Sequence, residues 1–180
     1  MANACQSQPL RHNDFTYLGT LPFDGTAHGI HRAVYKKMGA ITAANALFDF
    51  RVIQGASLRF TGIARNKGAE LPEGFSAGRV TVRIRPLLRR SQSELCATEP
   101  EDALDVARNL FERNGALLIA SSLPVMEKMR YRDTGGGSFI FYTAIVNGHV
   151  RVTDRDRFQS AYANGLGRGK AFGCGMIVLL

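Results

Sequence analysis

Cysteine is scarce in this sequence of 180 residues, and long apolar runs are missing. The three cysteines, Cys5, Cys96 and Cys174, form an odd count without paired spacing. This pattern disfavours a disulfide scaffold and a zinc site, and it fits a reducing compartment. No apolar run approaches the roughly 18 residues of a membrane span, and the first residues lack the basic flank and apolar core of a signal peptide. We therefore expect a cytoplasmic protein.

Acidic side chains are also in short supply. Asp and Glu number 15 against 23 Lys and Arg, which gives a net charge of +8 and an isoelectric point near 9.9. Of the basic residues 18 are Arg, whose planar fork binds phosphate and stacks on bases. The composition, with 45% hydrophobic and 21% charged residues, is that of a globular protein of one or two domains. Its charge favours a polyanionic partner, with nucleic acid ahead of a membrane.

The first part of the chain shows the pattern strand, helix, strand, strand. Phe15–Phe23 is aromatic and β-branched, which is typical of a strand, and Ala27–Met38 has apolar residues at helical spacings of three and four. Leu47–Ile53 and Leu58–Ala64 are expected to pair as two strands. The glycine-containing segment 66–78 is expected to be a loop.

The second part shows the order strand, helix, strands, helix, strand. The predicted strands are residues 79–85, 116–120, 139–146, 149–153 and 175–180, and the predicted helices end near Asn114 and Asn164. Asn147-Gly148 is the strongest two-residue hairpin signal in the chain. This order is that of a βαββαβ ferredoxin-like (RRM-like) sandwich with an extra hairpin. We predict an α+β protein of two ferredoxin-like lobes in tandem, an abbreviated one in residues 1–78 and a second in residues 79–180.

The strand at residues 79–85 alternates cleanly. Val80, Val82 and Ile84 point one way and are expected in the core, whereas Arg79, Thr81, Arg83 and Arg85 are expected to face outward. The charge continues into Arg89 and Arg90. This basic ladder is either a solvated strand face or a surface that contacts a ligand.

A glycine-rich loop precedes the last strand. Residues 167–175 contain four glycines with Arg168 and Lys170 between them, and the free N–H groups of such a loop can bind an anion. It is not a Walker loop, because Asn164 and Ala171 occupy the positions that need Gly and Ser or Thr. It is not a dinucleotide fingerprint either, because the helix comes before the loop and the strand after it.

This loop carries a family resemblance. Residues 165–179 resemble the C-terminal signature of the CRISPR-associated RAMP proteins, and most of all the CasE-type pre-crRNA endoribonucleases; the signature positions are Gly167, Gly169, Lys170, Gly173, Cys174 and Gly175. Gly55–Lys67 and Ile30–Lys36 resemble a strand and the first helix of the same family. Its members usually run longer between these two stretches, so the chain resembles a minimal variant, such as one from a type IV system.

The resemblance implies an endoribonuclease that cuts CRISPR repeat RNA beside its hairpin without a metal or other cofactor, leaving a 2′,3′-cyclic phosphate. It implies that the protein stays on the guide RNA as a subunit of an effector complex. His31 would be the general base or acid, His28 its partner, and Lys36 the cation that steadies the phosphorane. The expected RNA-binding residues are Arg32, Arg65, Lys67, Arg79, Arg83, Arg85, Arg89, Arg90, Gly167, Arg168, Gly169 and Lys170.

Several alternatives stay open at this point. An arginine-only site of Arg32, Arg51 and Arg65 could bind the phosphate without a titrating base. The chain could also be a RAMP subunit that only holds the guide RNA, or a general RRM-type binder. His12 and His149 are expected to have no catalytic role, and Cys174 is expected to be a small packing residue.

Overall fold

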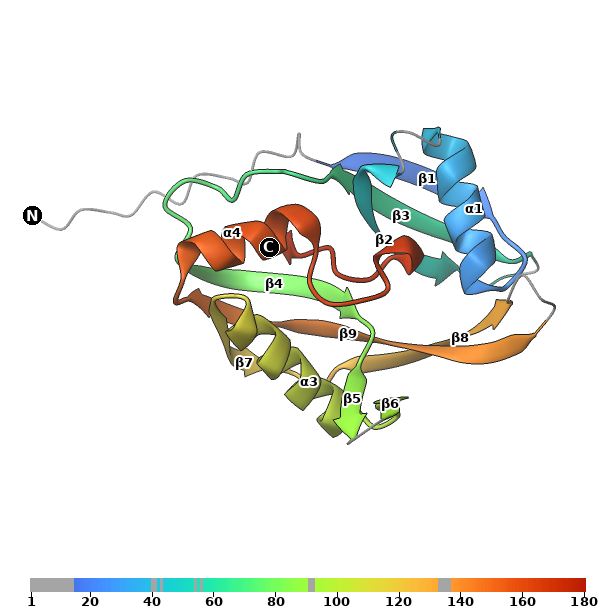
Figure 1. Ribbon diagram of the computed structural model, residues 1–180. Coiled ribbons are helices and arrows are strands. Elements are labelled where there is room, and N and C mark those ends of the chain that lie inside the picture. Colours follow the sequence, from blue (N-terminus) through green and yellow to red (C-terminus); the bar gives the residue numbers. More distant parts are fainter. Residues whose placement is uncertain are drawn as a thin grey trace, which may run out of the picture.

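The computed structural model describes residues 15–39, 42, 44–53, 55, 57–90, 93–132 and 137–180. The protein is a mixed α+β structure built on two antiparallel sheets that lie side by side (Figure 1). The first sheet comprises β1 (Thr16–Pro22), β2 (Ala46–Ile53) and β3 (Arg59–Asn66), in the spatial order β1-β3-β2. Helix α1 (Ala27–Met38) follows β1 and packs on one face of this sheet.

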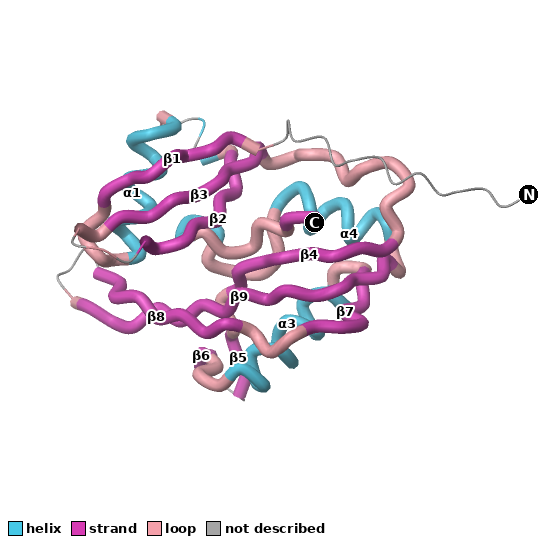
Figure 2. The backbone as a smooth tube through the Cα atoms, turned by 180° about the vertical axis from the view of Figure 1, so that it is seen from behind, coloured by secondary structure: helices cyan, strands magenta, loops and turns pink. Residues whose placement is uncertain are grey.

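The second sheet holds the remaining long strands in the order β10-β4-β9-β7, with β8 paired to β9. Its strands are β4 (Ala77–Ile84), β7 (Ala116–Ser121), β8 (Val125–Arg132), β9 (Ser138–Val152) and β10 (Val178–Leu179). Helices α3 (Pro100–Arg113) and α4 (Arg155–Asn164) and the short 3₁₀ helix η2 (Lys170–Phe172) connect them. A separate two-stranded ribbon consists of β5 (Leu87–Arg90) and β6 (Ser93–Cys96). Seen from behind, the strands lie nearest the viewer with the helices beyond them (Figure 2).

Local sequence explains where α1 begins and ends. The Thr26 hydroxyl accepts a hydrogen bond of 2.9 Å from the amide of Gly29, which satisfies one of the free donors of the first turn. Ile30 and Val34 are buried against the first sheet, and Ala27 is buried against Phe141 and Cys174, so the apolar face that the spacing predicts is confirmed. The helix ends at Gly39, whose φ of 80° suits glycine. The predicted helix is therefore confirmed at both ends.

The predicted hairpin at Asn147-Gly148 is wrong, because β9 runs straight through these residues. Asn147 pairs with Thr81 of β4, and Gly148 is paired on both sides, with Val80 of β4 and with Ser121 of β7. A Cβ on Gly148 would lie 2.6 Å from the carbonyl oxygen of Ala120. The glycine therefore allows close strand packing in the middle of a sheet, and it does not make a turn.

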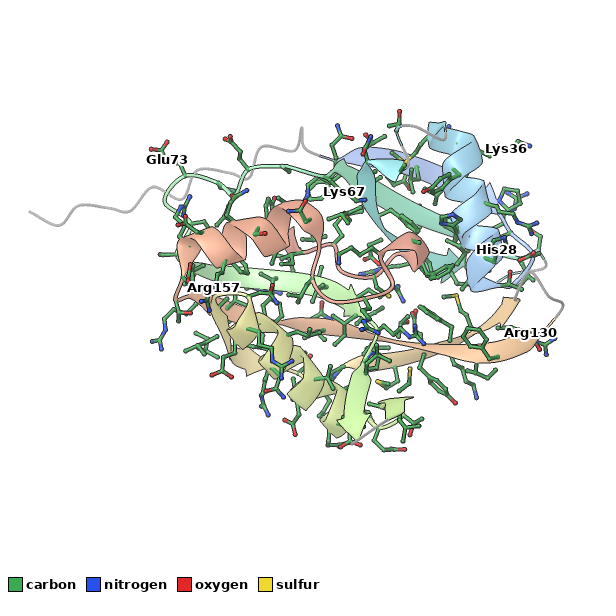
Figure 3. All side chains as sticks on the ribbon, in the orientation of Figure 1. His28, Lys36, Lys67, Glu73, Arg130 and Arg157 are labelled. Atoms are coloured by element: carbon green, nitrogen blue, oxygen red, sulfur yellow. The ribbon has the colours of Figure 1, made fainter. Side chains whose placement is uncertain are left out.

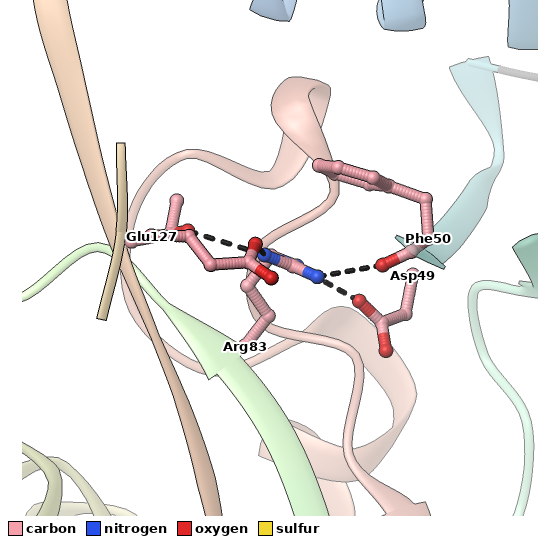
Figure 4. Close-up of polar contacts among 5 residues, drawn as sticks. Asp49, Phe50, Arg83 and Glu127 are labelled. Carbon is pink, nitrogen blue, oxygen red and sulfur yellow. Dashed lines mark hydrogen bonds and ion pairs between the residues drawn. The ribbon is translucent and has the colours of Figure 1, made fainter. Parts of the chain in front are cut away.

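Arg83 is buried between the two sheets, so the prediction that it faces outward is wrong (Figure 4). Its Nε donates to Asp49 at 2.9 Å, one Nη donates to the Phe50 carbonyl at 2.6 Å, and the other donates to Glu127 and to Thr143. Asp49 and Phe50 belong to β2, whereas Glu127 and Thr143 belong to β8 and β9. Burial alone would lower the pKa of Arg83, but the two carboxylates raise it above its ordinary value.

Replacing Arg83 by Leu is expected to destabilise the fold, because it leaves two carboxylates facing each other between the sheets. We expect a loss of about 3–5 kcal/mol in the free energy of unfolding, measured by urea denaturation. The control is Arg108→Ala, which removes an exposed ion pair with Asp105 and should cost less than about 1 kcal/mol. Equal effects of the two substitutions would contradict the role given to Arg83.

Candidate active site

His31 joins the first helix to the glycine-rich loop. Its Nδ1 lies 2.6 Å from the carbonyl oxygen of Ala171 in η2. A carbonyl only accepts hydrogen bonds, so Nδ1 carries the hydrogen and the Nε2 of the neutral ring keeps its lone pair. The imidazole also lies against Tyr35 and Phe172, with ring centroids 4.2 and 5.9 Å away. Residues 140 positions apart are thereby brought into one half-buried site.

The loop reaches His31 because two of its glycines permit a tight path. Gly173 and Gly175 have φ angles of 78° and 92°, which other residues adopt only with strain. A Cβ on Gly173 would lie 2.7 Å from the Phe50 ring, and a Cβ on Gly175 would lie 2.6 Å from the Leu166 carbonyl oxygen. The backbone of the loop therefore packs tightly against β2 and against Leu166, the residue just before the loop. The loop curls toward α1 (Figure 1).

Positive charge gathers beside this loop. Lys170 donates to the Gly167 carbonyl at 2.6 Å, and its pKa is lowered, first by desolvation and then by the charge of Lys67. Lys67 is exposed and donates to the Ala44 carbonyl at 2.8 Å (Figure 3). Arg168 is exposed in the same loop. The charges of Lys67 and Lys170 repel each other, and a nearby anion would relieve this repulsion.

His28 accompanies His31, but Lys36 does not. The rings of His28 and His31 are roughly stacked, with centroids 6.1 Å apart. Five residues advance a helix by a rotation of roughly 140° beyond a full turn, so Lys36 lies on another face of α1, near its C-terminal end (Figure 3). There it lines a groove of about 530 Å³ together with Arg32, which forms a 2.7 Å ion pair with Asp24.

Arg65 is a structural residue and not an exposed cation. It is buried, donates to the carbonyls of Ile177 and Tyr162 at 3.0 and 2.5 Å, and stacks on the Tyr162 ring at 3.7 Å. The expectation that it contacts RNA is therefore corrected, as for Arg83. The arginine-only alternative loses support as well, because Arg32 pairs with Asp24 while Arg51 is exposed on β2.

The remaining predicted cations are placed as follows. Arg79 is exposed on β4, and Arg85 is half-buried with its guanidinium 5.1 Å from the centre of the Phe141 ring. The side chains of Arg89 and Arg90 lie outside the described part of the structure. Cys174 is buried, and burial raises the pKa of its thiol to about 12, which fits the predicted packing role.

The sequence reasoning missed strand β8. Arg130 of β8 forms a bridge with Thr26, at the start of α1 (Figure 3). Lys128 and Arg130 are both exposed, and residues two apart on a strand share a face. The available signal was the alternation of the exposed Lys128 and Arg130 with the partly buried Met129 between them. No strand was predicted over these residues. These two cations belong to the strand that contacts the start of α1.

Comparisons with known proteins match the C-terminal part of the sequence and the fold of the whole chain. Residues 113–180 match the family described as "CRISPR associated protein". The fold is similar to that of a CRISPR endoribonuclease Cse3 bound to 19-nt RNA, with a TM-score of 0.66, 15% identity, and coverage of 92% of this chain and 100% of that one. Cse3 of Thermus thermophilus, bound to an RNA representing a pre-cleavage complex, has a TM-score of 0.64 and 14% identity, and the match covers 93% of this chain and 99% of that one. Cas6e of Escherichia coli str. K-12 has a TM-score of 0.64 and 14% identity, and the match covers 91% of this chain and 98% of that one.

No curated protein matches the chain in sequence. Within the described residues, no helix is long and apolar enough to cross a membrane, and no three metal-ligating side chains gather at one point. The resemblance predicted from the sequence, to CRISPR-associated proteins of the CasE type, is confirmed in the C-terminal sequence and in the fold.

The packing of the loop can be tested with one pair of glycine substitutions. Gly173→Ala adds a methyl group against Phe50, whereas Gly68 has a similar φ of 81° with nothing near its added Cβ. We expect Gly68→Ala to cost about 1–2 kcal/mol from backbone strain alone, and Gly173→Ala to cost about 1–3 kcal/mol more. Urea denaturation measures both. Equal costs would mean that the loop is not pressed against β2.

Proposed function

We propose that this chain, a CRISPR-associated protein of the CasE type, is a metal-independent endoribonuclease that cuts CRISPR repeat RNA beside its hairpin. The contact between His31 and the Ala171 carbonyl supports this proposal above all, because it places a titratable imidazole next to a cationic, glycine-rich loop. A ribonuclease without a metal needs both, a base for the 2′-hydroxyl and positive charge for the phosphate.

The chemistry assigned to His31 follows from its tautomer. Nε2 takes the proton of the 2′-hydroxyl, the 2′-oxygen forms a bond to phosphorus, and the bond from phosphorus to the 5′-oxygen breaks. The products are a 2′,3′-cyclic phosphate and a 5′-hydroxyl, whose oxygen needs one proton. We assign that proton to His28, one helical turn away. The Ala171 carbonyl stabilises the imidazolium that forms on His31, since it accepts from Nδ1 in both protonation states.

Binding of the RNA is assigned to the exposed cations and the glycine loop. Lys67, Arg168 and Lys170 lie at the loop, and its backbone at Gly167 and Gly169 allows a phosphate to approach. We assign hairpin phosphates to Arg79 of β4, to Arg85 just beyond this strand and to Arg32, with Lys128 and Arg130 added. Lys36 belongs with the groove that it shares with Arg32 and not with the reacting phosphate.

We infer that the two sheets are ferredoxin-like lobes. The order β10-β4-β9-β7 and the connections through α3 and α4 fit a complete βαββαβ unit once β8 is set aside. The order β1-β3-β2 with α1 fits the same unit without its second helix and fourth strand. The boundary falls near residue 78, at the start of β4, and Arg83 joins the two lobes.

After the cut, the protein is proposed to stay on the guide RNA hairpin in the cytoplasm, as a subunit of an effector complex. The similarity of the fold to a chain of a CRISPR RNA-guided surveillance complex, with a TM-score of 0.59 and 20% identity over 91% of this chain, supports this proposal. A second candidate is a subunit that binds and caps the guide RNA without cutting it. The position of Lys36 away from His31 favours this alternative.

Substitution of His31 separates the two candidates. We expect His31→Ala to slow single-turnover cleavage of a repeat RNA by about 10²–10⁴-fold, because it removes the general base, and to change hairpin affinity less than about threefold. His28→Ala should slow cleavage as well. The matched control is His149→Ala, an exposed histidine of β9 that should leave the rate unchanged.

Metal removal provides the second arm of this experiment. Cleavage in excess EDTA should match cleavage in magnesium, because the proposed chemistry uses only side chains. A rate that depends on magnesium would contradict the mechanism. Tight hairpin binding by the unmodified protein without any shortening of the RNA would support the binding-only subunit instead.

A further inference from the structure

A second surface suited to RNA lies on the first sheet, on the face turned away from α1. We call it the outer face. In an antiparallel sheet, residues directly opposite each other point to the same side, and the registers define three rows across the strands: Tyr17, Ile63 and Asp49; Thr20, Thr61 and Arg51; and Pro22, Arg59 and Ile53. The view from behind shows these strands with no helix in front of them (Figure 2).

Tyr17 is the most exposed large hydrophobic side chain on this face. It is 69% exposed, and its hydroxyl lies 3.0 Å from the Thr61 hydroxyl on the neighbouring strand β3. A ring tethered at its far end across an adjacent strand cannot swing freely into solvent. It offers an ordered aromatic surface, which is what base stacking requires.

The charge of the outer face is positive. Arg51 and Arg59 are both exposed, and neither forms an ion pair or side-chain hydrogen bond within the described residues. The one carboxylate in the three rows, Asp49, is bonded to the buried Arg83. The face therefore combines an ordered aromatic ring with two arginines and has no exposed carboxylate that is not already paired.

We propose that the outer face binds single-stranded RNA, with one base stacked on Tyr17 and neighbouring phosphates held by Arg51 and Arg59. Backbone-directed arginines beside an aromatic ring suit a strand of any sequence. The inference extends the proposed function, because a repeat hairpin has single-stranded flanks, but it uses none of the residues assigned to the cut. It implies that this face holds a flank while the hairpin occupies the site at His31.

Tyr17→Trp provides a direct reporter, since the sequence contains no tryptophan. Titration of the full chain with a ten-residue oligouridylate should quench the fluorescence of this variant, whereas a blunt repeat hairpin without flanks should not. Tyr17→Ala should weaken oligouridylate binding about tenfold. Tyr17→Phe is the matched control, because it keeps the ring and loses only the hydrogen bond to Thr61; its affinity should fall less than that of Tyr17→Ala.

The arginines are tested by salt dependence. Each of Arg51→Gln and Arg59→Gln should reduce the slope of log affinity against log salt for oligouridylate by about 0.7. Neither variant should change cleavage of the blunt hairpin.

The outcomes separate this inference from the proposed function. An absence of quenching, or equal affinity of Tyr17→Ala and the unmodified chain for oligouridylate, would overturn the inference whether or not the hairpin is cut. A change in emission with protein concentration alone would identify the face as a contact between copies of this chain and overturn it too. Failure to bind or cut the hairpin would count against the proposed function and leave the oligouridylate result standing.

Discussion

The buried guanidinium of Arg83 is the interaction on which the arrangement of the two sheets depends. It binds Asp49 and Phe50 of β2 on one side and Glu127 and Thr143 of β8 and β9 on the other. Its plane also lies over the Phe50 ring at 4.2 Å. A buried charge is stable only when its partners are fixed in place. The register of the first sheet against the second is therefore set by one side chain with a demanding geometry.

The candidate site inherits its geometry from this junction. Phe50, held by Arg83, is the surface against which Gly173 packs, and the amide of Gly175 donates to the Arg83 carbonyl at 2.7 Å. The glycine loop is thus fixed at two points before it reaches α1. Its Ala171 carbonyl then orients His31. An imidazole and a cationic, glycine-rich loop, contributed by the two halves of the chain, meet because Arg83 joins the sheets.

Local patterns predicted the elements well, but they could not predict partners distant in sequence. The strand and helix patterns up to Ile53 are confirmed, because periodicity and capping are local properties. Asn147-Gly148 was predicted to be a turn because the dipeptide alone does not show that it pairs with neighbouring strands. Arg83 looked exposed because its carboxylates lie 34 and 44 residues away. The adjacency of His31 and the glycine loop came from the family resemblance, since no spacing predicts a contact over 140 residues.

The hydrogen atom on His31 tests the central claim most directly. Long-range nitrogen–proton correlation NMR of the intact chain reports which ring nitrogen carries it in the neutral form. The contact with the Ala171 carbonyl predicts the Nδ1–H form, with Nε2 unprotonated and available as a base. Proline retains a backbone carbonyl, so Ala171→Pro should leave the hydrogen on Nδ1. His149, which is exposed on β9, serves as an internal reference. A neutral His31 with its hydrogen on Nε2 would contradict the account.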